Sequence, residues 1–164
     1  MSTDFKTLTD KIKSILDGEK SDALSDDLSV AVGDIRIGQY VPNESASKPL
    51  LYIRPEKPGL ISDMAGNMSR QEKICFLITA TVSGTDRDTV WDDIQNLFNN
   101  TQQILWNHCA EDGYWSGGHF GYSEGYEDNP EEYGQFSGDS GLDIIVLHFW
   151  LRWTIFVRIN REII

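Results

Sequence analysis

The stretch RQEKICFLITATVSG, residues 70–84, decides the fold, because it predicts a buried strand that leads directly into a helix. It is rich in β-branched and aromatic residues, and residues 74–78 are apolar on both faces, as is typical of a strand inside a sheet. The next residues, TDRDTV (85–90), supply capping candidates and acidic residues for the first turn of a helix. Apolar residues then recur at helical spacing to about residue 108, which predicts the main helix.

The last apolar segment, LDIIVLHFWLRWTIFVRI (142–159), alternates with the period of a strand. Its odd positions from Ile145 to Ile159 are all apolar, whereas its even positions include His148, Arg152 and Arg158. A strand of this length is well above the usual range. We therefore expect the segment either to bend, or to project beyond the domain at one end and pair elsewhere.

Further elements are predicted before the strand–helix unit. Residues 4–17 carry an amphipathic helical pattern that Gly18 would end. Residues 28–40 alternate as a strand whose phase changes at Gly33, and residues 50–54 form a short strand followed by a loop to about residue 69. The residues assigned to the core are Trp91, Ile94, Leu97, Phe98, Phe149, Leu151 and Trp153.

This order of elements predicts an α+β fold, with residues 1–164 forming one domain. In this fold an N-terminal helix and one long central helix pack on one face of a mostly antiparallel sheet. Residues 113–141 form a long acidic excursion, rich in glycine and aromatic residues, that is inserted before the last strand.

Charge is unevenly distributed along the chain. Fourteen Lys and Arg and 26 Asp and Glu give a net charge of −12, and residues 88–151 contain twelve acidic residues and no Lys or Arg. This balance disfavours general binding to duplex DNA or anionic membranes, because both need basic residues to replace counterions. The sequence shows no membrane-spanning run and no secretory signal, and its two cysteines fit a reduced cytoplasmic setting.

The acidic excursion is expected to be ordered, because a flexible linker would be poor in aromatic residues. Its rings either pack on the chain's own sheet or contact a partner. The candidate interface residues are Met64 and Met68 of the loop at 55–69, for which a plain exposed connection is the alternative, and Trp115, Phe120, Tyr122, Tyr126, Tyr133 and Phe136. The candidate acidic surface consists of Glu124, Glu127, Asp128, Glu131 and Glu132.

The sequence offers no nucleophile with a recognisable base. It contains no phosphate-binding glycine loop and no H-E-x-x-H, and no catalytic residue and no cofactor are predicted. His108, Cys109 and His119 match no standard zinc spacing, and the acidic pairs lack the calcium-binding ladder. Cys75 lies in an apolar strand, where burial is the expected role. The sequence therefore favours a protein that is not an enzyme and holds no metal.

The order of elements resembles that of the tail-terminator (tail-completion) proteins of tailed bacteriophages and related contractile particles. The resemblance is carried by LSVAVGDIRIG (28–38), by ICFLITATVSGTDRDTVWDDIQNLFNNTQQILW (74–106) and by LDIIVLHFWLRWTIFVRI (142–159). It covers most of the chain but not the acidic excursion. It concerns element order, length and pattern, because this family has no diagnostic motif and no catalytic residues.

The resemblance implies a structural virion protein that is assembled in the host cytoplasm and resides at the tail–neck junction. It would form a ring of six identical subunits that caps and terminates the tail tube and joins it to the head connector. The implied partners are further copies of the chain, the tail tube protein, the head–tail connector protein and, in a contractile tail, the sheath protein. DNA would pass through the ring without specific binding, because acidic walls repel phosphate. No membrane is implied.

Three alternatives stay open. One is another head–tail connector or a baseplate subunit, which belongs to the same structural class. The second is a monomeric module whose acidic, aromatic surface binds a cationic or sugar-like ligand. The third is an enzyme with an unrecognised acidic site. Self-assembly would support the structural class. A melting temperature that shifts with ligand would support the second alternative, and stabilisation by a metal together with hydrolytic activity would support the third.

Overall fold

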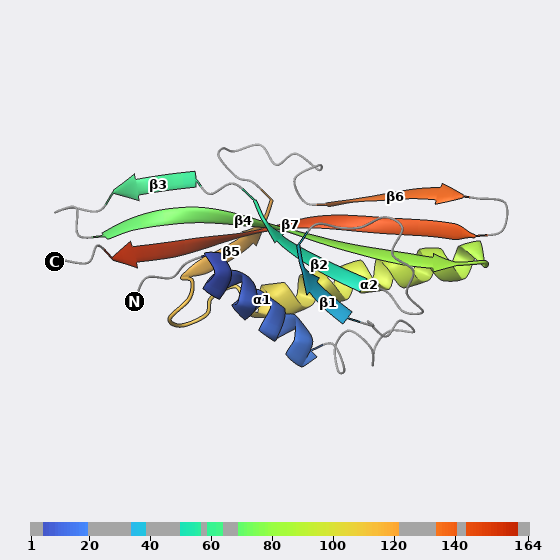
Figure 1. The fold of residues 1–164 in the computed structure, drawn as a ribbon, viewed down its shortest axis with the longest axis horizontal. Coiled ribbons are helices and arrows are strands. Elements are labelled where there is room, and N and C mark those ends of the chain that lie inside the picture. Colours follow the sequence, from blue (N-terminus) through green and yellow to red (C-terminus); the bar gives the residue numbers. More distant parts are fainter. Residues whose placement is uncertain are drawn as a thin grey trace.

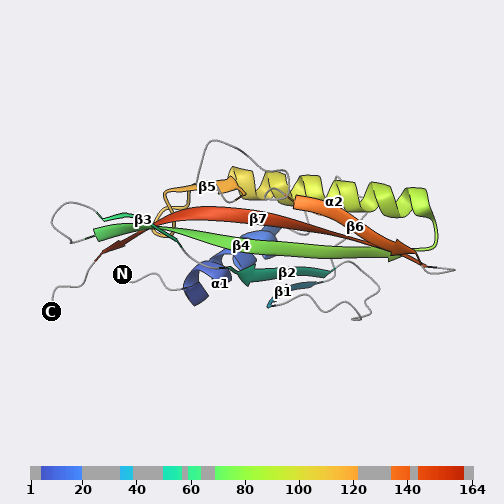
Figure 2. The same cartoon turned by 90° about the horizontal axis from the view of Figure 1, so that it is seen from above.

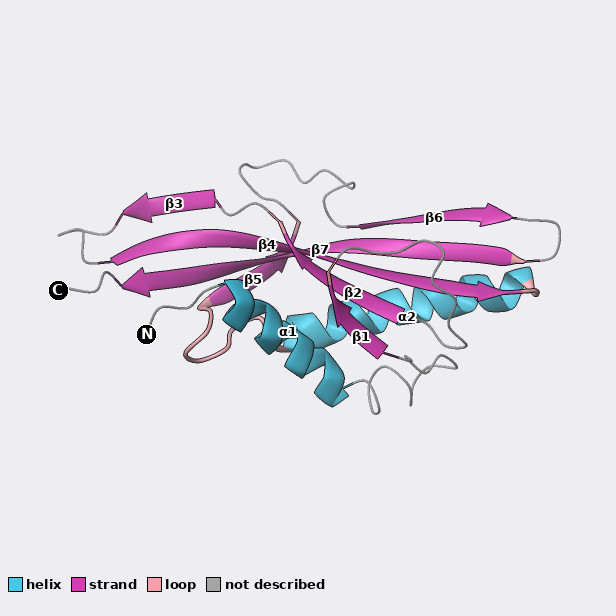
Figure 3. Ribbon diagram, viewed as in Figure 1, coloured by secondary structure: helices cyan, strands magenta, loops and turns pink. Residues whose placement is uncertain are grey.

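The computed structural model describes residues 5–19, 34–38, 50–56, 59–63, 69–121, 134–140 and 144–160. Two helices and one seven-stranded sheet occur in these ranges (Figures 1 and 3). The prediction of an α+β fold with a mostly antiparallel sheet is confirmed. In chain order the elements are α1 (Phe5–Glu19), β1 (Asp34–Ile37), β2 (Leu50–Pro55), β3 (Gly59–Asp63), β4 (Ser69–Gly84), α2 (Arg87–Asn107), β5 (Gly117–Phe120), β6 (Gly134–Ser140) and β7 (Ile145–Asn160).

Two strands of 16 residues each, β4 and β7, form the centre of the sheet. They are antiparallel, and their register runs without a break from Ser69 opposite Asn160 to Gly84 opposite Ile145 (Figure 2). Each strand supplies hydrogen-bond partners for the backbone N–H and C=O groups along the whole length of the other. The closing strand therefore finds its partner within its own chain along its whole length, and neither end is left to pair elsewhere.

Shorter strands lie end to end along the two outer edges of this central pair. On the β4 side, β2 pairs with residues 76–81 and β3 with residues 70–73. On the β7 side, β5 pairs with residues 153–156 and β6 with residues 145–151. β1 joins β2 in parallel, so the described sheet runs from β1 on one side to β5 and β6 on the other. The described parts of the acidic excursion thus contribute two strands to the sheet.

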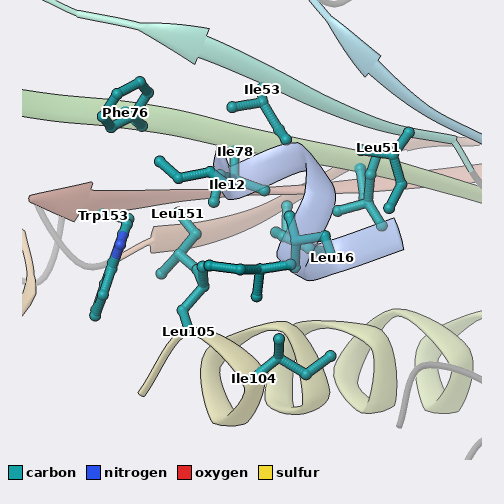
Figure 4. Close-up of a cluster of buried hydrophobic side chains, with 14 of the residues drawn as sticks. Ile12, Leu16, Leu51, Ile53, Phe76, Ile78, Ile104, Leu105, Leu151 and Trp153 are labelled. Carbon is teal, nitrogen blue, oxygen red and sulfur yellow. The ribbon is translucent and has the colours of Figure 1, made fainter. Parts of the chain in front are cut away.

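Both helices pack on one face of the sheet. Alternate residues of a strand point to opposite faces, and the even positions of β4 from Ile74 to Val82 and the odd positions of β7 from Leu147 to Val157 are buried. The buried residues of both helices belong to the same cluster: Leu8, Ile12, Ile15 and Leu16 of α1, and Val90, Ile94, Leu97, Ile104 and Leu105 of α2. Figure 4 shows Ile12 and Leu16 of α1 and Ile104 and Leu105 of α2 converging on Leu151.

The residues assigned to the core from sequence lie there. Ile94, Leu97, Phe149, Leu151 and Trp153 are buried, and Trp91 and Phe98 are partly buried and pack against them. Helical spacing on α2 and alternation on β7 account for this agreement, because each pattern directs its apolar residues to one side.

Several boundaries differ from the sequence prediction. Gly18 does not end the first helix, which continues to Glu19, because glycine also adopts the helical conformation. The loop predicted at 55–69 contains β3, since the first residues of β4 extend beyond β2 and leave a backbone edge that a short segment can pair with. Of the strand predicted at 28–40, residues 34–38 are described as β1 and the residue after it, and the phase change at Gly33 lies outside the described residues.

Candidate assembly surfaces

The turn that follows α2 buries one of the candidate interface residues. Trp115 is only 4% exposed, and its indole Nε1 donates a hydrogen bond of 3.0 Å to the carbonyl oxygen of His108. The last carbonyls of a helix lack partners within the helix, and this bond satisfies one just beyond its end. Trp115 therefore belongs to the core: self-packing applies to it, and the interface assignment for this residue is wrong.

Phe120 is also engaged inside the chain. β5 places it directly opposite Trp153, and the two ring centroids are 4.9 Å apart. On its other side the ring stacks on Trp106 at 6.4 Å. Trp153 is fully buried, whereas Trp106 is 54% exposed. These three rings run from the core to the surface at the end of α2, where Trp106 is exposed.

Charged contacts tie α1 to the same turn. Lys11 Nζ of α1 lies 3.8 Å from Glu111 Oε2 and 4.7 Å from the centroid of the Tyr114 ring. Glu111 also contacts Nδ1 of His108. Among the described residues, no three His, Cys, Asp or Glu side chains gather closely enough to hold a metal ion. The turn is thus held by an ion pair, a cation–π contact and the Trp115 hydrogen bond.

The remaining candidate residues are not placed by the structure. Phe136 lies on β6 opposite Phe149 in the register, but its side chain is outside the described part. The others lie wholly outside the described residues: Met64, Met68, Tyr122, Tyr126 and Tyr133, and the acidic Glu124, Glu127, Asp128, Glu131 and Glu132.

The face of the sheet opposite the helices carries a charged cluster from separate strands. Glu56, just after β2, accepts a hydrogen bond of 3.1 Å from Nε of Arg152 on β7, and its other oxygen is 3.8 Å from Nη2 of Arg54. The Arg152 guanidinium also lies 4.8 Å from the centroid of the Trp150 ring. Glu56 therefore has two basic neighbours, Arg54 close to it in sequence and Arg152 from the distant strand β7.

Two titratable groups in β4 and β7 have shifted pKa values because of burial. Burial raises the pKa of the Cys75 thiol to about 12, which keeps it protonated at neutral pH and unsuited to act as a nucleophile. Burial also lowers the pKa of His148, so its neutral form is favoured. Cys75 is therefore a core residue of the sheet, as its apolar sequence context indicates.

The strand edges at the two sides of the sheet differ. Among the described strands, β1, β3, β5 and β6 each pair on one side only. β1 carries Ile37, which is 47% exposed, whereas β3 has an irregular register between Leu60 and Ser62. β6 pairs regularly with β7 through all seven of its residues. On their other side, β3, β5 and β6 have no described strand as a neighbour.

The described acidic residues of the range 88–151 lie mainly on α2 and in the turn that follows it. They are Asp88, Asp92 and Asp93 of α2, Glu111 and Asp112 of the turn, and Asp139 of β6. The other acidic residues of this range lie outside the described residues.

Neither described helix has the length and apolar character needed to cross a membrane. Comparison of the sequence with protein-family models and with curated proteins gives no match.

Proposed function

We propose that this protein is a tail-terminator (tail-completion) protein, a virion protein of the tail–neck junction. In this proposal identical subunits form a hexameric ring that caps the tail tube, stops its growth and presents a surface to the head connector. The proposal is carried by one observation: the segments that resemble this family are the same segments that build the sheet centre and the long helix beside it. They are the β4–α2 unit and the closing strand β7, and a third segment that resembles the family contains β1 at the side of the sheet.

The strand edges support a ring. Subunits of a ring meet through two different surfaces, one on each neighbour, because a head-to-tail interface must close on itself. The described sheet has unlike strands at its two sides, β1 and the β5–β6 row. Such a sheet provides two distinct surfaces on one subunit.

The charge distribution supports a role around DNA. The exposed surface of α2 after Arg87 contains acidic and amide side chains, including Asp88, Asp92, Gln95 and Asn99. Acidic side chains repel the phosphates of DNA, and neutral amide side chains do not attract them strongly. Such a surface suits a ring through which DNA slides.

The first experiment is to measure the mass of the purified chain by light scattering over a wide range of concentration, with negative-stain images of the concentrated sample. Closed rings with six-fold class averages are the expected result. The second arm adds the protein to polymerising tail tubes, where it should stop their elongation. A protein that forms no rings and leaves tube length unchanged would contradict the proposal.

The acidic segment before β6 offers a more specific test. Neutralising its five carboxylates should leave folding intact and lower the yield of infectious particles. The matched control exchanges Glu for Asp and Asp for Glu at the same five positions, which keeps the charge. An unchanged yield in the neutralised variant would exclude a role for this segment in assembly. The positions are Glu124, Glu127, Asp128, Glu131 and Glu132.

A further inference from the structure

The sheet has a seam at which its short outer strands succeed one another. On the β4 side, the ladder with β2 ends at Phe76 and the ladder with β3 begins at Lys73. On the β7 side, the ladder with β6 ends at Leu151 and the ladder with β5 begins at Trp153. The regular pairing on both outer sides of the central strands is thus interrupted at nearly the same level of the β4–β7 pair.

The end of β2 is weakly attached to β4 at this seam. Among the residues that the structure describes, one backbone hydrogen bond bridges the gap on this side, from the N–H of Glu56 to the carbonyl oxygen of Cys75 at 2.7 Å. Pro55, the last residue of β2, has no N–H and contributes no donor. A strand end with so few backbone bonds can open without the rest of the fold, because local opening breaks only the contacts of that segment.

A side-chain contact holds this strand end in place. Arg152 extends from β7 across β4, and its Nε donates a hydrogen bond of 3.1 Å to Oε2 of Glu56. The two side chains are only 26% and 16% exposed, respectively. A charge-assisted hydrogen bond between largely buried groups is stronger than an ion pair on the open surface. This contact therefore adds to the single backbone bond between Glu56 and β4.

Cys75 is buried beside the same contact. It occupies an odd position of β4, so it lies on the face of the sheet that points away from the helices, yet it is fully buried. Burial is the main cause of the raised pKa of its thiol, and the side chains of Thr154, Glu56 and Arg152 also affect that pKa. These three groups are therefore close neighbours of the thiol, and two of them form the contact between β7 and the end of β2.

We propose that Pro55–Glu56 is a strap over Cys75 and that Arg152 is the latch of this strap. While Arg152 holds Glu56, the strap stays on β4 and the thiol is inaccessible. When the contact is broken, the strap leaves β4 and Cys75 becomes accessible while the helices and the central strands stay folded. The strap is a property of the isolated chain, so its test is separate from that of the tail-terminator function.

Thiol labelling in a Cys109→Ser background tests the strap. Cys75 is labelled with N-ethylmaleimide at neutral pH over a range of urea concentrations, and mass spectrometry gives the rate. With Glu56 intact, labelling should require global unfolding, and its rate should rise steeply with urea. Glu56→Ala should label about 10- to 100-fold faster in the absence of urea than its own global unfolding allows, because it loses a charge-assisted hydrogen bond. Its rate should depend little on urea, since a local opening exposes little surface.

Three variants serve as controls or as a second test. Glu56→Gln keeps an acceptor for Arg152 and should show a smaller increase of the same kind; it decides the test if Glu56→Ala does not fold. Arg54→Gln removes the other basic neighbour of Glu56, which is 3.8 Å away, and should label as slowly as the background protein. Trp115→Phe lowers global stability away from the strap, so its labelling should keep the steep dependence on urea.

Hydrogen exchange provides an independent measure of the same opening. The amide at position 56 should exchange faster in the Glu56 variants, whereas the amides of residues 78–80, in the middle of the β4–β7 ladder, should keep their protection. If labelling of the Glu56 variants depends on urea as steeply as that of the background protein, Cys75 opens only with the whole fold and the proposal is wrong. Equal labelling of Glu56→Gln and Arg54→Gln, or rapid labelling with Glu56 intact, would also overturn it, because the contact with Arg152 would then not be the latch.

Discussion

Replacing Gly118 with alanine is expected to destabilise the protein, because a Cβ at this position would collide with Trp153. Built on the backbone, that atom lies 2.8 Å from Cη2 of the indole and closer still to Cζ2. The indole has little room to move, since it is fully buried and its ring centroid lies 4.9 Å from that of Phe120. Either β5 shifts away from β7, or the indole leaves its favoured rotamer.

The size of the effect follows from overpacking. Forcing an extra carbon into a well-packed core costs about 1–3 kcal/mol, and the smaller entropy of the unfolded alanine chain returns about 0.4–1 kcal/mol. A net loss of about 1–2 kcal/mol is therefore expected, which lowers the Tm of a chain of this size by about 2–8 °C. The substitution is expected to be destabilising because the cost of the steric clash exceeds the gain from the smaller entropy of the unfolded chain.

The neighbouring glycine provides the control. A Cβ on Gly117 would meet Cδ2 of Phe156 at 3.6 Å, an ordinary van der Waals distance, so Gly117→Ala should be neutral or slightly stabilising. Urea unfolding followed by tryptophan fluorescence measures both variants. In a Trp153→Leu background the cost of Gly118→Ala should largely disappear. The reasoning is refuted if Gly118→Ala is as stable as Gly117→Ala, or if its cost persists without the indole.

Four further predictions concern Trp115, the two cysteines and His148. Trp115→Phe removes the donor to the His108 carbonyl and should cost about 1–2 kcal/mol in urea unfolding; an unchanged midpoint would show that the bond contributes nothing. A thiol reagent should modify the half-buried Cys109 in the folded protein and Cys75 only after unfolding. Because the pKa of Cys75 is about 12 when folded and near 9 when unfolded, its contribution to stability is complete below pH 9 and is lost as pH rises toward 12, and Cys75→Ala should flatten that decline. The lowered pKa of His148 means that the unfolded chain binds its proton first, so stability should fall as pH drops below about 6.5; a His148→Gln variant with the same acid limb would exclude this cause.

The apolar pattern of the sequence was sufficient to predict the longest helix and the two longest strands. The strand predicted at 70–84 is β4 at Ser69–Gly84, and the helix predicted to about residue 108 is α2 at Arg87–Asn107. Both have a strong apolar period that covers many residues, and such a period directs one side of the element to the core. The closing strand has the same property, and its observed bounds, Ile145–Asn160, differ from the prediction by three residues at most.

The edge strands could not be found in the same way. β3, β5 and β6 are short, and β5 and β6 are rich in glycine, so they have little apolar period of their own. β3 pairs with the part of β4 that extends beyond β2, and β5 and β6 pair with the side of β7 that does not face β4, so each of them provides partners for backbone groups of a long strand. Their existence depends on the length of their neighbours.

The burial of individual aromatic residues could not be predicted from the sequence either. Composition marks Trp115 and Phe120 as unusual, but it does not separate a ring that packs inside from one that faces a partner. The turn after α2 brings Trp115 against the His108 carbonyl, and β5 brings Phe120 against Trp153. Trp106, on the helix, is 54% exposed.

The sequence by itself determined the α+β class, the long strand–helix unit, the length of the closing strand and the concentration of negative charge between residues 88 and 151. These properties depend on residues that are close together in the chain. Only the tertiary structure decided that β4 pairs with β7 over their full length, which strands complete the two sides of the sheet, and which rings are buried. The reason is physical: the paired residues of β4 and β7 are more than sixty positions apart, and a local pattern specifies that a strand needs a partner without specifying which one.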